Sequence, residues 1–361
     1  MYGYSSGSTK SQNLVFQNNQ ISGSGYVGMQ IQRVNELKVL ENVVDIPTTY
    51  GIYISDCDGH TEINKNQVHV ANGYGIYIQN SNGGTPPATQ RILVSNNFIS
   101  TQSNNTYSFY LYNCTNLDVL YNSVYTYGGT SGSVSFYTFQ GTDTEIKNNN
   151  FVNTVGGYSM YIQNSSGIQS SDHNNLFTTG TTLAFWDGDQ VDLAALQSAS
   201  GMDGNSVSLD PAFISTDSYK FSNDQLDSVG TPHARVLDDI EGSARGPVYT
   251  TIGAWKYDPN VLGIDTDRPL AIIPKTFVVD QNYPNPFNPV TRIRFGVPSD
   301  QMVKIEIFNL LGQQVAIISN EMRKAGYHTI TIDASAMASG LYFYLVSGEK
   351  KQIIKKMMVV K

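Results

Sequence analysis

The chain repeats two short phrases at nearly regular intervals, and this repetition limits the folds open to it. The phrase YGIYISDCDG begins at Tyr50, and the phrase YGIYIQNSNG begins at Tyr74. A second phrase, apolar-x-x-Asn-x-apolar, recurs between them with the anchors Asn19, Asn42, Asn66, Asn97, Asn122, Asn149 and Asn175. The anchors are 23, 24, 31, 25, 27 and 26 residues apart. Two independent markers with one period indicate a stacked structural unit and not a duplicated site.

Each repeat has the pattern of β structure. Its apolar stretches have the length of strands, alternate with polar residues and are separated by Asn, Gly and Ser turns. Seven coils in parallel register, each about 4.8 Å above the last, form a rod of roughly 30–35 Å. This architecture resembles the right-handed parallel β-helix, or pectin-lyase-like, superfamily over about residues 14–187. We therefore expect an all-β fold class, with a β-helix solenoid over residues 1–187.

Two sets of repeated residues are expected to be structural. The anchor asparagines suit left-handed turn positions, and each side-chain amide can hydrogen-bond the Asn above and below it. Cys57 and Cys114 occupy equivalent places two coils apart. That separation is roughly 9–10 Å, which is beyond the reach of a disulfide. We predict two free thiols that point into the solenoid.

An aromatic column is the first candidate site. Because Ile52 and Ile54 share one face of a strand, the residue between them takes the other face. The same parity gives an outward column of Gln30, Tyr53, Tyr77, Tyr110, Tyr137, Tyr161 and Phe185. Aromatic stacking alone explains such a column, and a glycan-contacting platform is the alternative. The insertion Gly83–Gln90, rich in Gly and Pro, is expected to protrude as a loop beside it.

The stretch SDCDGHTEINK is the best local candidate for chemistry. It offers Asp56, Asp58, His60 and Lys65 as acid, base or Ca²⁺-binding groups. The resemblance implies polysaccharide lyases or glycoside hydrolases, yet the chain has no convincing catalytic set. Asp56 aligns with turn asparagines, and Asp58 precedes a glycine as turn residues do. Catalysis therefore stays open, Ca²⁺ is the only cofactor considered, and no metal site is assigned.

Residues 188–258 are expected to cap the solenoid. LAALQSASGMDGNSVSLDPAF, followed by DDIEGSARGPVYTTIGAWKYDP, resembles the closing segment of secreted bacterial β-helix proteins. A cap is required because an open last coil would expose unpaired edges and core. Asp239 and Arg245 are expected to form a structural ion pair. Residues 259–280 lose the period and are interpreted as a linker.

Residues 281–361 carry five motifs in order. Alternation in TRIRF, VKIEIF, HTITID and LYFYLV predicts a small antiparallel Ig-like β-sandwich. The motifs YPNPFN, NLLGQQV, AGYH, SGLYFY and KKMMVVK resemble the type A sorting domain of the type IX secretion system. The motif residues are Pro284, Asn285, Pro286, Phe287, Gly312, Gly340, Lys356 and Lys361. The resemblance implies passage across the outer membrane and a sortase-like partner that attaches the cargo to surface lipopolysaccharide. A generic adhesion module is the alternative.

Charge and hydropathy limit the partners. The net charge is −8, and the part before Asn282 carries 12 Lys and Arg against 25 Asp and Glu, which disfavours nucleic acid as a partner. No apolar run reaches the roughly 18 residues of a transmembrane helix. The start shows no signal peptide, so we expect an N-terminally incomplete chain located extracellularly or at the outer-membrane surface. The function predicted is polysaccharide binding or processing; the alternative is a non-catalytic adhesion or structural rod.

Overall fold

The computed structural model describes residues 2–3, 9–23, 25–46, 49–83, 90–258, 276–279, 281–282 and 285–360. Several predicted features lie outside these residues: Pro284, Lys361, residues 84–89 of the insertion, and residues 259–275 and 280 of the linker. The chain forms two compact units, Met1–Leu262 and Gly263–Lys361.

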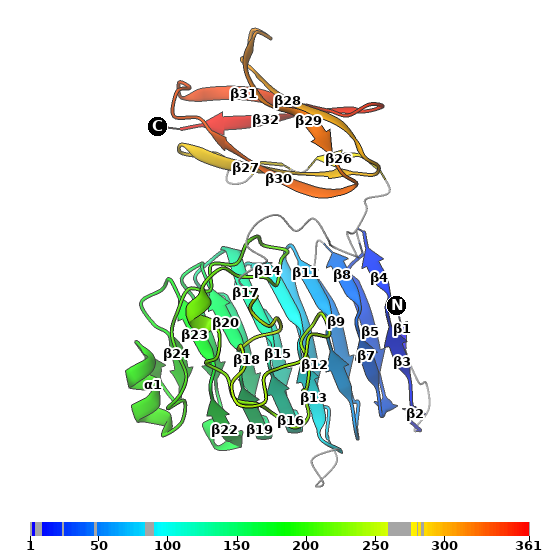
Figure 1. The fold of residues 1–361 in the computed structure, drawn as a ribbon, viewed down its shortest axis with the longest axis vertical. Coiled ribbons are helices and arrows are strands. Elements are labelled where there is room, and N and C mark those ends of the chain that lie inside the picture. The colour runs from blue at the N-terminus through cyan, green and yellow to red at the C-terminus, as the bar shows by residue number, and fades with distance from the viewer. Residues whose placement is uncertain are drawn as a thin grey trace. The chain divides into compact units, whose positions relative to one another are not determined.

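The first unit is a parallel β-solenoid, as predicted, and its strands form three sheets (Figure 1). Sheet 1 contains β1 (Tyr2–Gly3), β5 (Val27–Gln32), β9 (Thr49–Ser55), β12 (Gly73–Gln79), β15 (Tyr107–Tyr112), β18 (Val134–Phe139), β21 (Tyr158–Ile162), β24 (Ala184–Trp186) and the antiparallel β25 (Asp189–Gln190). Sheet 2 contains β3 (Val15–Gln17), β7 (Lys38–Leu40), β10 (Glu62–Asn64), β13 (Ile92–Ser95), β16 (Thr115–Leu120), β19 (Thr142–Lys147) and β22 (Ile168–Asp172). Sheet 3 contains β4 (Gln20–Ser22), β8 (Val43–Ile46), β11 (Gln67–Val70), β14 (Phe98–Ser103), β17 (Ser123–Gly129), β20 (Asn150–Asn153) and β23 (Asn175–Thr178). The short strands β2 (Ser11–Gln12) and β6 (Val34–Asn35) pair with each other.

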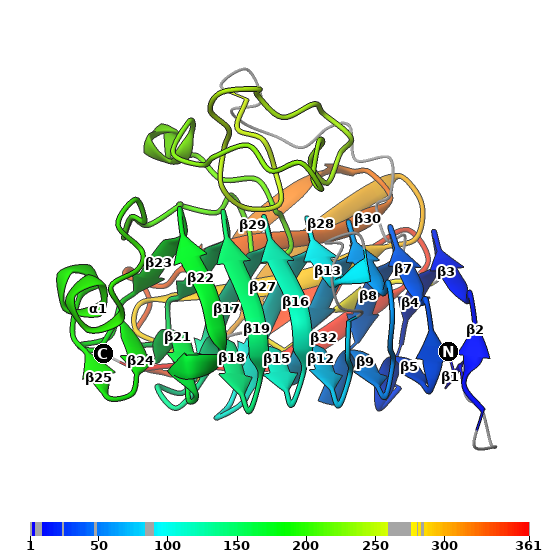
Figure 2. The same ribbon diagram turned by 90° about the horizontal axis from the view of Figure 1, so that it is seen from below.

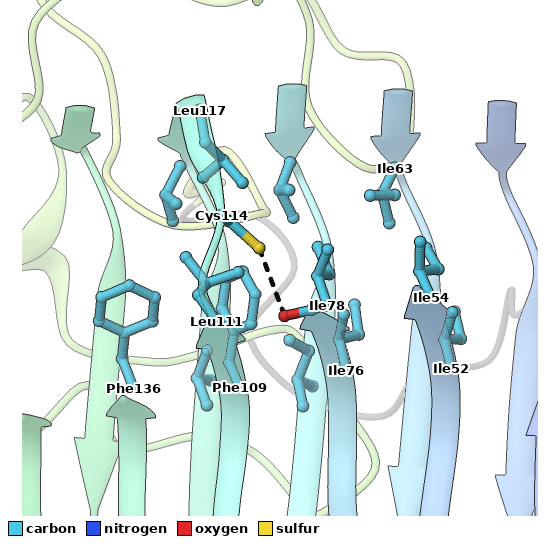
Figure 3. Close-up of a cluster of buried hydrophobic side chains, with 14 of the residues drawn as sticks. Ile52, Ile54, Ile63, Ile76, Ile78, Phe109, Leu111, Cys114, Leu117 and Phe136 are labelled. Carbon is cyan, nitrogen blue, oxygen red and sulfur yellow. Dashed lines mark hydrogen bonds between the residues drawn. The ribbon is translucent and has the colours of Figure 1, made fainter. Parts of the chain in front are cut away.

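One sequence repeat therefore makes one coil of three strands. Equivalent residues lie side by side in neighbouring coils: Ile52 pairs with Ile76, and Ile76 pairs with Phe109. Their side chains are fully buried and form one core with Leu111 and Phe136 along the solenoid (Figure 3). The core is continuous because each coil alone cannot bury its apolar face and gains that burial from its neighbours.

The anchor asparagines form a buried hydrogen-bonded ladder. Asn42 Nδ2 donates to Asn66 Oδ1 at 2.9 Å, and Asn66 Nδ2 donates to Asn97 Oδ1 at 2.9 Å. The backbone N–H of each Asn donates to the same oxygen of the next coil, and Asn66 Nδ2 also reaches the carbonyl of Val39. The predicted stacking of these residues is confirmed, and the column is structural.

Two details of the ladder differ from prediction. The last member is Asn174, whose Oδ1 accepts from Asn149 Nδ2 at 3.1 Å, whereas Asn175 bonds to Asn150 in sheet 3. The anchors do not hold the left-handed turn position. The preceding residue does, as in Asn96 with a φ of 52° and His173 with a φ of 55°. The amide of the anchor is thereby free to point inward.

Both cysteines are free and buried, as predicted. Cys114 Sγ donates to the carbonyl of Ile78 at 3.4 Å (Figure 3). Ser81 occupies the equivalent position in the coil between the cysteines, where its Oγ accepts from the backbone N–H of Cys57. Burial raises the pKa of each thiol to about 12, so neither is a ready nucleophile.

The segment after β25 closes the core and then folds back. The helix α1 (Leu193–Ser200) begins at Asp192, whose side chain accepts from the backbone of Ala195, and its Leu196 joins the solenoid core. The ladder ends where Asn174 N–H donates to Ser206 Oγ at 2.9 Å. Residues further along lie against sheets 2 and 3: Val236, for example, packs on Leu93, Leu120 and Tyr121.

Asp239 and Arg245 have structural roles, but the expected ion pair between them is wrong. Asp239 accepts backbone N–H groups of residues 241, 243 and 256. Arg245 donates to Asn96 Oδ1 at 2.6 Å and to the carbonyl of Gly253, and its guanidinium lies 3.8 Å above the ring centre of Tyr121. Burial lowers the pKa of Arg245 to about 10. Each residue binds polar groups that the fold-back of the chain would otherwise leave buried and unpaired.

The second unit is a small antiparallel β-sandwich. One sheet contains β26 (Val278–Val279), β27 (Val290–Val297) and β30 (Gly326–Asp333), and the other contains β28 (Gln301–Phe308), β29 (Gln314–Arg323), β31 (Gly340–Ser347) and β32 (Gln352–Val359). Alternate residues of the two sheets, such as Ile293, Ile305 and Val346, are fully buried between them. The predicted sandwich is confirmed.

Candidate functional site

The predicted aromatic column is present on the outer face of sheet 1. The strand register places Tyr53 beside Tyr77, Tyr77 beside Tyr110, Tyr137 beside Tyr161, and Tyr161 beside Phe185. Adjacent rings are close: the centroids of Tyr77 and Tyr110 are 4.6 Å apart, and those of Tyr161 and Phe185 are 4.2 Å apart. The column therefore runs along the solenoid axis.

A second aromatic column, missed in the sequence, lies beside the first. Tyr50 and Tyr74 pair across β9 and β12, and their rings are 5.2 Å apart. The column continues through Tyr107 in β15 and Tyr158 in β21, each in ring contact with the first column. The outer face of sheet 1 thus carries two tyrosine columns, which we call the tyrosine face.

A break in strand alternation creates this second column. In β9 both Gly51 and Ile52 are buried, so Tyr50 and Tyr53 point outward together although strict alternation would separate them. The inward position needs a very small residue because a Cβ on Gly51 would collide with Val68 and the carbonyl of Gly75. The signal in the sequence is the column Gly28, Gly51, Gly75, Ser108, Ser135 and Ser159, all buried.

The rings form two stacks with different orientations. The first contains Tyr50, Tyr74, Tyr77 and Tyr110, and the second contains Tyr107, Tyr137, Tyr161 and Phe185. Neighbours within a stack lie within 26° of parallel, whereas Tyr107 and Tyr110 meet at 75°. A ring inside a stack has its faces covered by its neighbours and presents its edge and hydroxyl to solvent.

Packing leaves most of these tyrosines half-buried. Tyr53, Tyr77, Tyr110 and Tyr161 are of intermediate exposure, but Tyr137 is only 8% exposed. Desolvation, followed by the neighbouring phenols, raises the pKa of Tyr77 and of Tyr110 and that of Tyr137 to about 12. The phenols of Tyr77, Tyr110 and Tyr137 are therefore neutral hydrogen-bonding groups at physiological pH.

The two carboxylates in the turn after β9 make contacts that are typical of structural turn residues. Asp56 has a φ of 53°, like Asn80 at 47° and Asn113 at 50° in the equivalent turns. Asp58 is ion-paired with Lys10 and accepts the backbone N–H of Asn82 at 3.2 Å. Both carboxylates therefore serve local conformation or coil stacking, the roles that turn residues of this type fill.

His60 and Lys65 lie beyond opposite ends of strand β10 in sheet 2. His60 precedes β10 and lines a cavity of about 280 Å³ with Asn13, Val15, Glu36 and Lys38. Its Nδ1 is buried without a hydrogen-bond partner among the described residues. Lys65 follows β10 and binds Asp238 of the folded-back segment at 2.6 Å. The structure does not bring Lys65 together with Asp56, Asp58 and His60.

No metal centre is found among the residues described. In that part of the chain, no group of three or more His, Cys, Asp or Glu side chains is arranged to hold an ion. Within the same residues, no helix has the length and apolar character needed to cross a membrane.

The first sorting motif is bound to the C-terminal strand. Asn285 Oδ1 accepts the N–H of Met358 at 2.8 Å. Phe287 exchanges backbone bonds with Met358 and Val360 at 3.0 and 2.9 Å, and its ring is 2% exposed. Pro286 between them is exposed. The two ends of the sorting unit, far apart in sequence, therefore form one element beside β32.

The other motifs shape turns and surface. Gly312 has a φ of 74° in the β28–β29 turn, where Asn309 Oδ1 accepts the N–H groups of Leu311 and Gln313. The left-handed φ explains the glycine. Leu310 and Leu311 at this turn are 66% and 82% exposed. Gly340 begins β31 with a φ of 157°, a value that residues with a side chain rarely adopt, which explains the glycine at this position as well.

Comparisons with known proteins agree with this architecture. A family model described as "Secretion system C-terminal sorting domain" matches residues 281–360, and one described as "Right handed beta helix region" matches residues 4–99. No curated protein matches the chain. The sorting domain indicates export by type IX secretion to the cell surface or extracellular space. The chain is therefore a right-handed parallel β-helix protein that ends in a type IX secretion C-terminal sorting domain.

Proposed function

We propose that the exported β-helix binds polysaccharide through the tyrosine face. The observation that carries the proposal is the double column of outward tyrosines on sheet 1, with rings in contact over successive coils. Phenol hydroxyls and ring edges match the hydroxyl and C–H groups that alternate on a sugar chain. In Figure 2 sheet 1 runs along the lower edge of the solenoid, and the segment after α1 lies on the opposite side.

The contacts of the folded-back segment support this choice of face. Val236 packs on Leu93 and Leu120 of sheet 2, and Phe213 packs on Phe98 and Tyr125 of sheet 3. Sheets 2 and 3 are thus partly covered by the folded-back segment, whereas no residue of that segment is found in ring contact with the tyrosines of sheet 1 among the described residues. Aromatic side chains at such surfaces contribute strongly to binding because they bury large areas at low entropic cost.

The binding is tested by affinity electrophoresis of the whole chain in gels that contain soluble polysaccharides. The double variant Tyr77→Ala, Tyr110→Ala is expected to lose retardation by at least about tenfold in affinity, which corresponds to about 1.4 kcal/mol. Tyr249→Ala is the matched control, since Tyr249 is 67% exposed away from sheet 1. Equal retardation of both variants refutes the proposal.

The non-catalytic adhesion or structural rod is the second candidate. It is favoured by the stacking itself, which covers ring faces and stabilises the coils without any ligand. No retardation of the unsubstituted chain by any polysaccharide favours this candidate. Lyase action, the processing alternative, creates unsaturated sugar ends that absorb ultraviolet light, and no absorbance change on uronate polymers with or without Ca²⁺ eliminates it.

We propose further that a sortase-like enzyme of the secretion system acts on the sorting unit during export. The sequence motifs of residues 281–360 carry this proposal. Mass spectrometry of the protein recovered from the surface of a secreting cell tests it. A product that retains strand β32 contradicts removal of the unit.

A further inference from the structure

The strands that bear the tyrosine face contain no charged residue. The seven parallel strands of sheet 1 from β5 to β24 contain no Asp, Glu, Lys, Arg or His. Sheet 2 differs, since its outward positions include Lys38, Glu62, Asp118 and Glu145, which lie in register. A site for an anionic polymer requires cations that replace the water lost by its carboxylates. The strands of sheet 1 contain no cationic side chain.

The border of the face would also oppose an anionic chain. The charged residues in the turns that follow β5, β9 and β24 are Arg33, Glu36, Asp56, Asp58 and Asp187, and Asp189 follows in β25. Asp58 is neutralised by Lys10. The remaining charged residues of this border carry a net negative charge, so the border repels carboxylate polymers at low ionic strength.

Apart from the Asp189 carboxylate, which accepts a hydrogen bond from the Tyr158 hydroxyl at 2.8 Å, the polar groups of the face are neutral donors and acceptors. Tyr77 donates its hydroxyl proton to Gln79 Oε1 at 2.8 Å, and Gln79 Nε2 donates to Tyr53 Oη at 2.6 Å. Tyr137 donates its hydroxyl proton to Gln163 Oε1 of the following coil. Phenols and amides linked in this way offer hydroxyl-sized hydrogen-bonding sites at each coil without ionic groups.

The columns also have a direction. The register of equivalent tyrosines follows the solenoid axis, with one step of about 4.8 Å per coil. From Tyr53 in β9 to Tyr161 in β21 there are four steps, or about 19 Å. An extended sugar chain lying along the axis meets a new tyrosine at each coil, whereas a chain crossing the strands meets the tyrosines of one or two coils.

We propose that the tyrosine face binds a neutral polysaccharide as an extended chain aligned with the solenoid axis. The proposal rests on the proposed function and narrows it: the ligand class is an uncharged glycan, and the site comprises both columns. Uronate polymers are excluded as high-affinity ligands of this face.

The first experiment compares polymer classes with the full chain. Affinity electrophoresis is run with neutral polymers (a mixed-linkage β-glucan, an unsubstituted xylan and a β-mannan) and with polygalacturonate and alginate, at low and high salt. The expected result is retardation by a neutral polymer that changes less than about twofold with salt, because no counterions are released. Retardation by polygalacturonate or alginate alone, weakened by salt, overturns the proposal.

The second experiment tests the direction. Isothermal calorimetry with oligosaccharides of the retarding polymer is expected to show affinity that rises until the chain spans the row from Tyr53 to Tyr161. Tyr53→Ala and Tyr161→Ala are each expected to weaken the longest oligosaccharide by at least about threefold, while Tyr249→Ala leaves it unchanged. Affinity that stops rising at the disaccharide overturns the axial arrangement.

The outcomes separate this inference from the function on which it rests. Uronate binding that is lost in the Tyr77→Ala, Tyr110→Ala variant preserves polysaccharide binding and overturns the neutral ligand class. Retardation by no polymer at all overturns both. Binding is also expected to be constant from mildly acidic to mildly alkaline pH, since burial raises the pKa of Tyr137 and Tyr158 to about 12 and the phenols keep their protons throughout that range.

Discussion

Replacement of Asn97 by alanine tests the physical basis of the solenoid. The Asn97 side chain donates to the carbonyl of Ile63 at 2.8 Å and to Asn122 Oδ1 at 2.9 Å. Its own Oδ1 accepts the backbone N–H and the Nδ2 group of Asn66 at 3.0 and 2.9 Å. Asn97 is fully buried, so water cannot replace these partners.

The expected loss in the free energy of unfolding follows from these four hydrogen bonds of the Asn97 side chain. A neutral hydrogen bond contributes about 1 kcal/mol net, and a buried partner left unpaired costs about 1–3 kcal/mol. Four bonds, with some partners retaining a second bond, give a loss of roughly 3–6 kcal/mol in the free energy of unfolding. This is a large share of the roughly 5–15 kcal/mol typical of a folded domain.

Urea unfolding followed by tryptophan fluorescence measures this loss selectively. The two tryptophans, Trp186 and Trp255, both lie in the solenoid unit. With a slope of about 2–3 kcal/mol per molar urea, the midpoint of Asn97→Ala is expected to fall by roughly 1–3 M. Asn72→Ala is the control, because Asn72 is exposed at a turn. A midpoint for Asn97→Ala equal to that of Asn72→Ala refutes the stabilising role of the ladder.

Three further outcomes are expected. Gly51→Ala is expected to lower the free energy of unfolding by about 1–3 kcal/mol through overpacking. Gly204→Ala, at a position with open space around it, is expected to leave the free energy of unfolding unchanged. Equal urea midpoints for the two variants contradict the explanation given for the break in alternation at β9. Cys57 and Cys114 are expected to react with a thiol reagent only as fast as the solenoid opens. Burial raises the pKa of both thiols to about 12 and thereby suppresses the reactive thiolate. Rapid labelling of the native chain argues against their burial. Phe287→Ala is expected to destabilise the sorting unit by about 3–5 kcal/mol, so that limited proteolysis cleaves residues 281–360 faster. An unchanged cleavage rate shows that the Phe287 contact does not stabilise the unit.

The candidate site was only partly predictable from sequence. Strand alternation was sufficient to predict that Tyr53 and Tyr77 point outward, because each lies between two isoleucines that point inward. Strict alternation would put Tyr50 on the same inward face as Ile52, because a period of two cannot reveal a local break in alternation. Only the packing of Gly51 against Val68 shows why both tyrosines point outward.

The recurring Asn phrase and its period were sufficient to determine a parallel solenoid, because only stacked coils satisfy the same hydrogen-bonding residue in every repeat. The motifs of residues 281–360 were likewise sufficient to identify the sorting domain. Tertiary structure alone decided that Asn174 and not Asn175 ends the ladder, and that the segment after α1 returns to sheets 2 and 3. It also decided that Phe287 lies beside Val359. The reason is physical: these choices depend on contacts between residues far apart in sequence, whose geometry is set by neighbouring coils and strands and not by local pattern.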